Sequence, residues 1–196
     1  MKSIFTLLLI LLSIFCLAQQ GETSKEFQDN LNKDYANTSK SPLAAEDLKV
    51  FRGLDFYDIS VKFIVEATFK KLENQPVFEM KTTTLRLPKY KKYGEITFEI
   101  DRVLYKLNVY QNLDLIKTLE YADYLFLPFL DLTCENQSYI GGRYIDLKIP
   151  SSNKIIVDFN KAYNPYCAYS STFSCPIVPF ENSLNLQILA GVKKFH

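Results

Sequence analysis

Four charged side chains in the C-terminal third of the chain could carry chemistry: Arg143, Asp146, Asp158 and Glu181. A carboxylate in a polar pocket can act as a general acid or base, and Asp158 with Glu181 could bind a divalent cation through oxygen. The alternative is structural, because arginine pairs readily with carboxylates. Arg143 would then form an ion pair with Asp158 or Glu181 and hold a long loop to a sheet. We favour the structural interpretation.

Amide and aromatic side chains are concentrated in the same part of the chain, above all between Asp158 and Asn182. They include Asn160, Asn164 and Asn182, and the rings of Tyr139, Tyr144, Tyr163 and Tyr169. The tyrosines could line a groove for a sugar or another ring-shaped ligand, although such rings more often belong to a core. The asparagines are typical of loops in which side chains satisfy backbone groups. Since the stretch is rich in Pro, Asn and Ser, we expect a long ordered loop.

Cys167 and Cys175 lie eight residues apart in that loop. In an exported chain they could form a disulfide, and the alternative is a pair of buried thiols. A zinc site made from these two and Cys134 would lack a fourth ligand, because the only histidine is His196, the last residue. The same absence disfavours nucleophilic catalysis that depends on histidine. We therefore predict a Cys167–Cys175 disulfide, no metal and no cofactor.

Residues 1–18 have the pattern of a signal peptide, with Lys2, an apolar run from Ile4 to Leu17, and Ala18 before the cleavage point. Cleavage would leave 19–196 as one β-rich domain without a second apolar run, and so without a membrane span. The chain has 23 Lys and Arg against 22 Asp and Glu, so removal of Lys2 leaves 22 of each. A formally neutral domain does not favour a nucleic-acid partner. We expect an exported protein, either periplasmic or extracellular.

The elements that must position these side chains are mainly β. Residues 24–35 carry apolar side chains at four-residue spacing, which is typical of an amphipathic helix, and 43–48 could form further helical turns. Alternating apolar residues predict strands at 61–69, 79–87, 93–100, 103–110, 143–149, 154–159 and 184–189. Asp101-Arg102 would join two of them in a hairpin. Residues 119–132, interrupted by Pro128, are expected to form an irregular segment over the sheet.

This order of elements predicts a mainly β fold (α+β by count). The expected architecture is an antiparallel β-sandwich or barrel with an N-terminal amphipathic helix and a long ordered C-terminal loop.

Three motifs resemble those of a bacterial domain-of-unknown-function family: GGRYIDL at 141–147, DFNKAYNPYCAY at 158–169 and SCPIVPFEN at 174–182. The family patterns are GGRYxDL, DFNxAYNPxCAY and SCPxPPxEN, and the resemblance extends over almost the whole chain after the leader. The chain departs from them at Val178, where the family has a proline, and at Val192, where an acidic residue is usual. Cys134 and Ile140 also replace small or polar residues. The resemblance implies membership of the family and no particular activity.

Two functions remain open. The leading hypothesis is a non-enzymatic binding or interaction module of the cell envelope, whose partner is an unknown small molecule or envelope component. The alternative is a small hydrolase or lyase that uses carboxylate, Tyr and Arg groups around Arg143, Asp158 and Glu181. A cavity that contains one of these carboxylates with a raised pKa would favour the enzyme. A filled core with the charged groups paired would favour the module.

Overall fold

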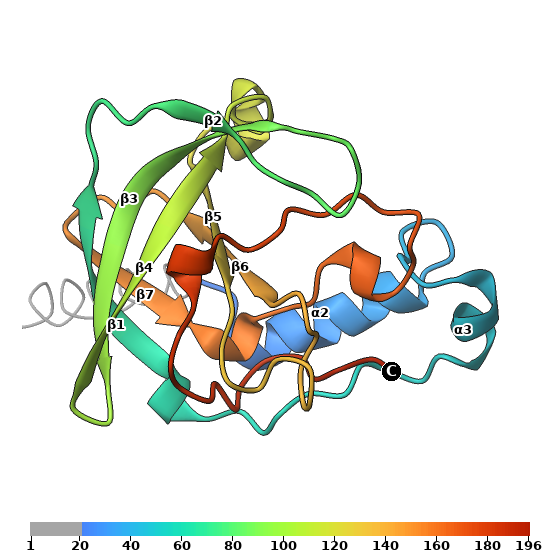
Figure 1. Cartoon of the computed structure of the whole chain (residues 1–196). Helices are drawn as coiled ribbons and strands as arrows, with labels where there is room; N and C mark the ends of the chain where they lie inside the picture. The colour runs from blue at the N-terminus through green and yellow to red at the C-terminus, as the bar shows by residue number, and fades with distance from the viewer. Residues whose placement is uncertain (1–20) are drawn as a thin grey trace, which may run out of the picture.

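The chain folds around one antiparallel sheet that curls into a half-barrel (Figure 1). The computed structural model describes residues 21–196, so the predicted leader lies outside the described residues. The strands are β1 (Ile64–Lys71), β2 (Val77–Glu79), β3 (Lys89–Ile100), β4 (Val103–Asn112), β5 (Tyr124–Phe129), β6 (Arg143–Lys148) and β7 (Lys154–Asp158). Their order is β6-β5-β4-β3-β1-β7, with β2 paired to β3. Helices α2 (Ser24–Ala36) and α3 (Ala45–Val50) precede the sheet. The predicted mainly β, antiparallel fold class is confirmed.

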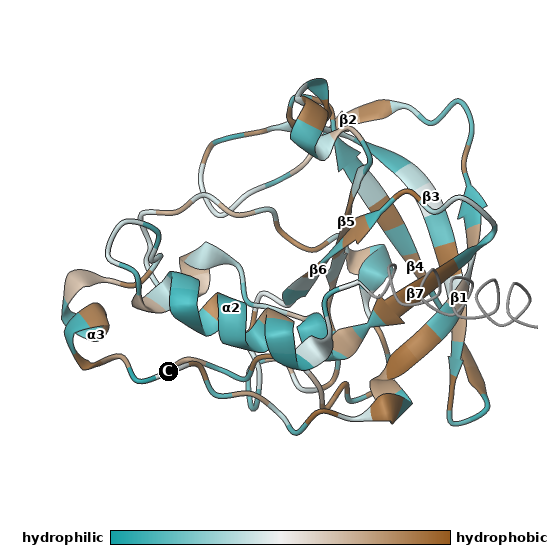
Figure 2. Ribbon diagram, turned by 180° about the vertical axis from the view of Figure 1, so that it is seen from behind, coloured by the Kyte–Doolittle hydropathy of each residue, from teal (hydrophilic) through white to brown (hydrophobic). Residues whose placement is uncertain are grey.

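The main apolar core lies on one face of the sheet. The buried side chains that the two longest strands contribute are Ile96, Phe98, Ile100, Leu107 and Val109. Phe159, Leu184 and Ile188 join them from the segments after β7. Figure 2 shows hydrophobic stretches on the strands, whereas α2 presents mainly hydrophilic residues to the viewer. The C-terminal part of the chain therefore covers the sheet as an apolar layer.

The hairpin predicted at Asp101-Arg102 is present. Ile100 pairs with Val103, and the two turn residues have φ values of 53° and 65°. Positive φ at both central residues is the requirement of a tight turn that matches the twist of its strands. Here two residues with side chains adopt it without glycine.

A β-bulge in β3 turns one tyrosine to the opposite face of the sheet. The register with β4 shifts between Lys92 and Gly94. In a regular strand Tyr90 would share a face with Ile96, but beyond the bulge it packs in a second apolar cluster on the other face. A side chain at Gly94 would not fit, because an added Cβ would lie 2.6 Å from the ring of Phe69. The bulge thus brings Tyr90 toward the pocket described below.

Two segments differ from the predicted pattern. Strand β2 ends at Glu79, so most of the strand expected at 79–87 is absent, and the Thr82 hydroxyl instead donates to the carbonyl of Arg86 at 2.6 Å. Such local side-chain bonds compete with a strand ladder. The segment 119–132, expected to be irregular, contains β5, in which Pro128 pairs with β6.

The strand expected at 184–189 is also absent from the structure. The backbone there is held by buried side chains rather than by a neighbouring strand. The Ile188 carbonyl accepts a hydrogen bond from Arg143 Nη2 at 2.9 Å, and the Ile188 N–H donates to Asp131 Oδ2 at 2.8 Å. These bonds satisfy backbone groups that a strand ladder would otherwise pair.

The predicted amphipathic helix corresponds to α2. It begins with a capping box in which the Thr23 hydroxyl accepts from the Glu26 N–H and the Glu26 carboxylate accepts from the Thr23 N–H. The buried Gln28 amide donates to the carbonyl of Asn160 at 3.0 Å. This bond attaches α2 to the segment that follows β7, beside β6 (Figure 1).

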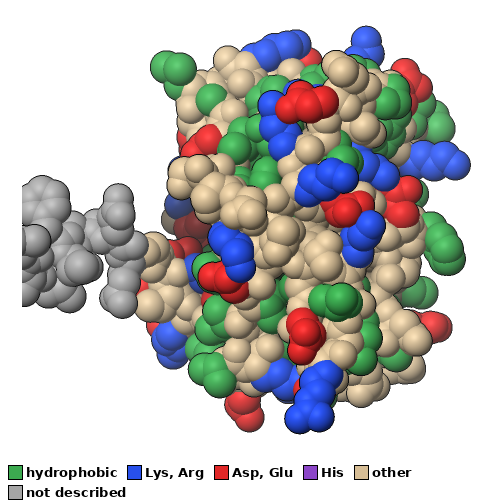
Figure 3. Space-filling view, turned by 90° about the vertical axis from the view of Figure 1, so that its left-hand side faces the viewer, with side chains coloured by type: hydrophobic (Ala, Val, Ile, Leu, Met, Phe, Trp, Pro, Cys, Tyr) green, Lys and Arg blue, Asp and Glu red, His purple; other side chains and the backbone are tan. Residues whose placement is uncertain are grey.

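Over residues 21–196, no helix is both long enough and apolar enough to cross a membrane. On the face drawn in Figure 3, basic and acidic side chains are interspersed with apolar ones. That face therefore presents no extended surface of a single charge.

Candidate ligand-binding pocket

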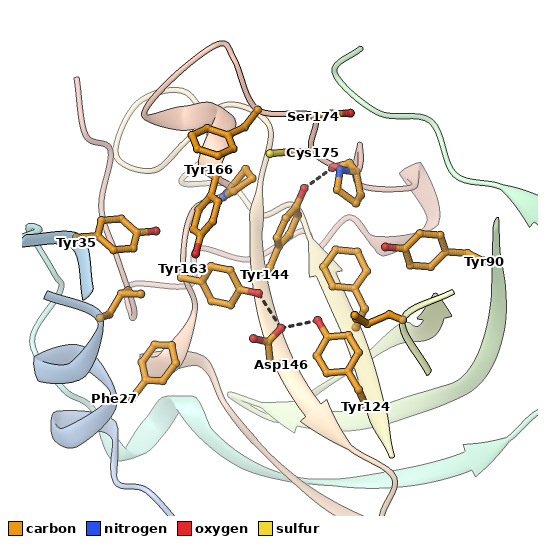
Figure 4. A pocket seen from close by; sticks show the side chains of 16 residues that line it. Phe27, Tyr35, Tyr90, Tyr124, Tyr144, Asp146, Tyr163, Tyr166, Ser174 and Cys175 are labelled. Atoms are coloured by element: carbon orange, nitrogen blue, oxygen red, sulfur yellow. Dashed lines mark hydrogen bonds between the residues drawn. The ribbon is translucent and has the colours of Figure 1, made fainter. Parts of the chain in front are cut away.

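A pocket of ≈ 360 Å³ lies on the face of β5 and β6 that is turned away from the main core (Figure 4). Four parts of the chain line it: α2, the residues Tyr90 and Leu115, the strands β5 and β6, and the loop from residue 163 to 176. Most of the lining side chains are aromatic. The pocket is therefore a meeting point of segments that are far apart in the sequence.

Strand alternation explains how β6 reaches both the core and the pocket. Arg143 and Ile145 point to the core side, and Tyr144 and Asp146 line the pocket. Gly142 makes the sharp entry into β6 with φ 85°, and an added Cβ there would lie 2.5 Å from a backbone oxygen. The GGRYIDL motif thus sets the direction of all four side chains.

The carboxylate of Asp146 is the polar centre of the pocket. Its Oδ1 accepts hydrogen bonds from the hydroxyls of Tyr124 at 2.6 Å and Tyr163 at 2.7 Å. Oδ2 accepts none from the described residues. Burial raises the pKa of Tyr163 well above its ordinary range, and the Asp146 charge adds to this effect, so the phenol stays protonated and donates.

The Asp146 side chain is exposed to solvent through the pocket, yet protein atoms crowd its carboxylate closely. This desolvation raises its pKa above the ordinary value of 3.8, and the two tyrosine hydrogen bonds oppose the rise only in part. A carboxyl group of this kind can accept hydrogen bonds, pair with a cation or transfer a proton.

The rings around Asp146 stand at steep angles to one another. Phe126 and Tyr144 have centroids 4.7 Å apart and planes at 77°, and Tyr144 and Tyr163 lie 5.9 Å apart at 87°. The Tyr144 hydroxyl donates to the carbonyl of Pro176, which attaches the loop to β6. The backbones of Tyr144 and Tyr163 also exchange hydrogen bonds of 2.9 and 3.0 Å. The pocket is therefore formed by side chains that hold one another in place.

One hydroxyl group in the lining is buried and has no partner among the described residues. The Tyr35 side chain is 1% exposed, and its hydroxyl makes no hydrogen bond. Figure 4 shows this hydroxyl pointing from α2 toward the rings on the other side of the pocket. A buried unpaired hydroxyl is unfavourable, and a bound ligand with a donor or acceptor would satisfy it.

The predicted disulfide is not present, because Cys167 and Cys175 are free thiols in the structure. The Cys175 sulfur accepts a hydrogen bond of 3.1 Å from the backbone N–H of Cys167. The Cys175 thiol acts on Cys167 as a hydrogen-bond partner and lowers the pKa of Cys167. Cys175 lines the pocket, and the Cys167 sulfur lies 3.7 Å from the Tyr139 hydroxyl.

Arg143 does not pair with Asp158 or Glu181, which corrects the interpretation made from the sequence. It is fully buried and pairs with Asp131, whose Oδ1 lies 3.1 Å from Nη2. Nη1 and Nη2 donate to carbonyls of the C-terminal segment, among them that of Val192 at 3.3 Å, whereas the buried Nε has no partner among the described residues. Arg143 is thus a structural residue on the core side of β6.

Asp158 and Glu181 also lie outside the pocket, so the expected convergence of the three charged residues does not occur. Asp158 accepts from the Ser24 hydroxyl at 2.6 Å. Glu181 pairs with Lys92 at 2.7 Å, and this ammonium lowers the pKa of Glu181. Across residues 21–196 no group of three or more His, Cys, Asp and Glu residues could hold a metal ion.

The three asparagines of the loop are fully buried and bond to backbone groups. Asn160 bonds to both the N–H and the carbonyl of Ser60, at 2.9 and 3.0 Å. Asn164 donates to the carbonyl of Lys193 at 3.0 Å. Asn182 donates to the carbonyls of Asn108 at 2.8 Å and Pro128 at 2.7 Å. Tyr169 packs edge to face on Tyr35, 5.0 Å between centroids, in a cluster next to the pocket.

The pocket residues that the sequence did not single out are Tyr90, Tyr124, Phe126 and the apolar face of α2. The four-residue apolar spacing in 24–35 predicted the helix itself but not its place in the pocket. The position of Tyr90 depends on the bulge in β3, which no sequence pattern indicated. Tyr124 lies in a segment expected to be irregular.

Comparisons with known proteins place the chain in a family. The family model described as "Protein of unknown function (DUF1684)" matches residues 49–193. The chain belongs to the DUF1684 family. A solved structure similar to this DUF1684 chain is the solution NMR structure of the uncharacterized protein from gene locus rrnAC0354 of Haloarcula marismortui. The two chains are 32% identical with a TM-score of 0.67, over 85% of this chain and 89% of the other. A comparison with curated proteins found no match.

The DUF1684 match divides the pocket lining into two parts. Asp146 and its partners Tyr124 and Tyr163 lie inside the matched residues. The apolar face of α2, including Tyr35, precedes them. The polar centre of the pocket is therefore a feature of the matched domain, and the helix adds apolar surface to it.

Proposed function

We propose that this DUF1684 chain is a binding module that holds a small molecule in the pocket between α2, β5, β6 and the loop after β7. The observation that carries the proposal is the state of Asp146. Two tyrosine hydroxyls fix one carboxylate oxygen of this pocket-lining residue, and the other oxygen accepts no hydrogen bond from the described residues. An oriented polar group among aromatic side chains is the usual composition of a small-molecule site.

The rest of the pocket supports the same function. The buried, unpartnered hydroxyl of Tyr35 adds a further polar group to a mainly aromatic lining. Lining residues such as Tyr144 are fixed by bonds to the backbone, so the cavity exists before a ligand enters. A preformed cavity lowers the entropic cost of binding.

The experiment is a ligand-observed NMR screen of a fragment library against the purified protein and two variants. Asp146→Asn keeps the shape of the side chain and removes its charge. Asp58→Asn makes the same change at an exposed aspartate outside the pocket and serves as the matched control. We expect fragments that bind the wild type and the control and that bind Asp146→Asn more weakly. A screen in which every hit binds all three proteins equally would contradict a site at Asp146.

A small hydrolase or lyase is the second candidate, and the raised pKa of Asp146 favours it. A carboxyl group with a raised pKa beside protonated phenols can serve as a general acid or base. The residues would be Asp146, Tyr124 and Tyr163 rather than Arg143, which is buried in the core. The enzyme would be the better interpretation if the protein turns over a substrate and Asp146→Asn abolishes this turnover while the melting temperature and fragment binding persist.

We also infer that the module acts outside the cytoplasm, in the periplasm or the extracellular space. The signal-peptide pattern of residues 1–18 supports this inference. Intact-mass spectrometry of the protein from a cell-envelope or culture fraction should show a chain that begins at Gln19. A full-length chain in the cytoplasmic fraction alone would contradict export.

A further inference from the structure

We propose that the ligand of this pocket is a small organic ammonium ion whose cationic group lies between Asp146 and the surrounding aromatic rings. This inference rests on the proposed binding function and names the chemical class that the pocket would accept. Three features of the lining support it: its charge, the free oxygen of the carboxylate and the angles between the rings.

The charge of the lining favours a cation. Of the 16 side chains that line the pocket, Asp146 alone is a carboxylate, and none is Lys, Arg or His. An anionic ligand would meet a like charge without any basic partner. A cation would meet one opposite charge inside a pocket, where charge pairs are stronger than at an open surface.

The free oxygen of Asp146 requires a partner when the pocket is filled. Both tyrosine hydrogen bonds go to Oδ1, and Oδ2 accepts none from residues 21–196. A ligand without a positive charge or a donor would displace water from Oδ2 and leave a desolvated carboxylate unpaired, which is unfavourable. An ammonium group compensates that charge directly.

The ring angles favour a compact cation over a flat sugar. A sugar stacks best on one flat aromatic surface, whereas Tyr144 meets Phe126 at 77° and Tyr163 at 87°. Rings at right angles offer no single flat stacking surface, and the negative face of an aromatic ring attracts a cation. The cavity of ≈ 360 Å³ is at the small end of the range for ligand sites, which fits a small cation.

The test compares a cation with its neutral isostere. Isothermal titration calorimetry of the full chain would use choline chloride and 3,3-dimethyl-1-butanol, which has carbon in place of the charged nitrogen, with sodium chloride added to equalise the ionic strength. We expect choline to bind at least roughly tenfold more tightly, in keeping with a desolvated charge among aromatic rings. Asp146→Asn should remove this preference, and Asp58→Asn should keep it.

A second variant keeps the test decisive if Asp146→Asn folds poorly. Tyr166 lines the pocket and is 44% exposed, so Tyr166→Leu removes an aromatic face with little effect on the core. It should weaken choline binding several-fold more than binding of the neutral isostere.

Two outcomes separate the ligand class from the binding function. If the isostere binds as tightly as choline, or if Asp146→Asn leaves choline binding unchanged, the ammonium assignment is wrong. The same holds if neither probe binds while neutral fragments from the NMR screen bind in a manner that depends on Asp146. In these cases the pocket remains a binding site for another ligand class. If no fragment and no probe depends on the pocket, the proposed function itself is wrong.

Discussion

Replacing Asp131 with Asn should be among the most destabilising isosteric changes in this protein. The side chains of Arg143 and Asp131 are both completely buried, and their charged groups lie 3.1 Å apart. An asparagine has a single side-chain oxygen, so it can accept from Arg143 or from the Ile188 N–H but not from both, and the substitution also removes the negative charge. The guanidinium of Arg143 then remains buried without a counter-charge.

The expected magnitude follows from that unpaired charge. Removal of one partner of a buried ion pair costs about 3–5 kcal/mol, because the remaining charge stays desolvated. For a domain of this size, each kcal/mol lowers the melting temperature by roughly 2–4 °C, so the total shift should be about 6–20 °C. The C-terminal segment should loosen first, because Arg143 and Asp131 bind the backbone of Ile188.

Urea unfolding followed by circular dichroism would measure the change in the free energy of unfolding. Asp114→Asn is the matched control, because the Asp114–Lys117 pair is exposed and such pairs contribute only ~0–1 kcal/mol. A loss below about 1 kcal/mol in Asp131→Asn, similar to the control, would refute the reasoning.

Three further predictions concern the loop and the pocket. Asn182→Leu should lower the free energy of unfolding by about 2–3 kcal/mol, because it leaves the buried N–H and carbonyl of Asn108 unpaired; urea unfolding would measure this. Asp146→Asn should be slightly more stable than the wild type at pH 7. Because the pKa of Asp146 is raised above 3.8 in the folded state, protonation of this carboxyl stabilises the fold fully below pH 3.8, and the stabilisation is lost as the pH rises through the folded-state pKa. The difference in melting temperature between the wild type and Asp146→Asn should therefore vanish near pH 3. Solvent screening keeps the difference in the free energy of unfolding below about 1 kcal/mol. Iodoacetamide at pH 7 should alkylate Cys167 faster than Cys134, because the pKa of the Cys167 thiol is lowered and burial raises that of Cys134. Peptide mass spectrometry would measure the two rates, and equal rates would contradict the prediction.

The sequence predicted those parts of the fold that depend on local pattern. The hairpin at Asp101-Arg102 and the strands on either side follow from alternation alone, and so does the helix that became α2. The strand predicted at 143–149 is present as β6, and its alternation puts Arg143 on one face and Tyr144 on the other. Local periodicity was sufficient to predict each of these elements, because each one buries the face that carries its apolar residues.

The parts that were missed depend on contacts between distant segments. Asp131 was not recognised as the partner of Arg143, because the two meet only when β5 and β6 pair. The strand expected at 184–189 has an alternating pattern, but side chains from elsewhere occupy its backbone groups. Strands β4 and β5 pair at Tyr110 with Phe126. Nearby, the Asn182 amide bonds to both strands, an arrangement that no local pattern reveals.

Strand β6 keeps the stabilising and the binding groups on opposite faces. Arg143 organises the C-terminal backbone on one face, and Asp146 faces the pocket on the other. A carboxylate with a raised pKa slightly lowers the free energy of unfolding at neutral pH. The ion pair between Arg143 and Asp131 is separated from it by the sheet, so changes in the pocket lining need not disturb that pair. Asp146 can therefore keep one carboxylate oxygen without a hydrogen bond from the described residues, and the proposed binding function rests on this feature.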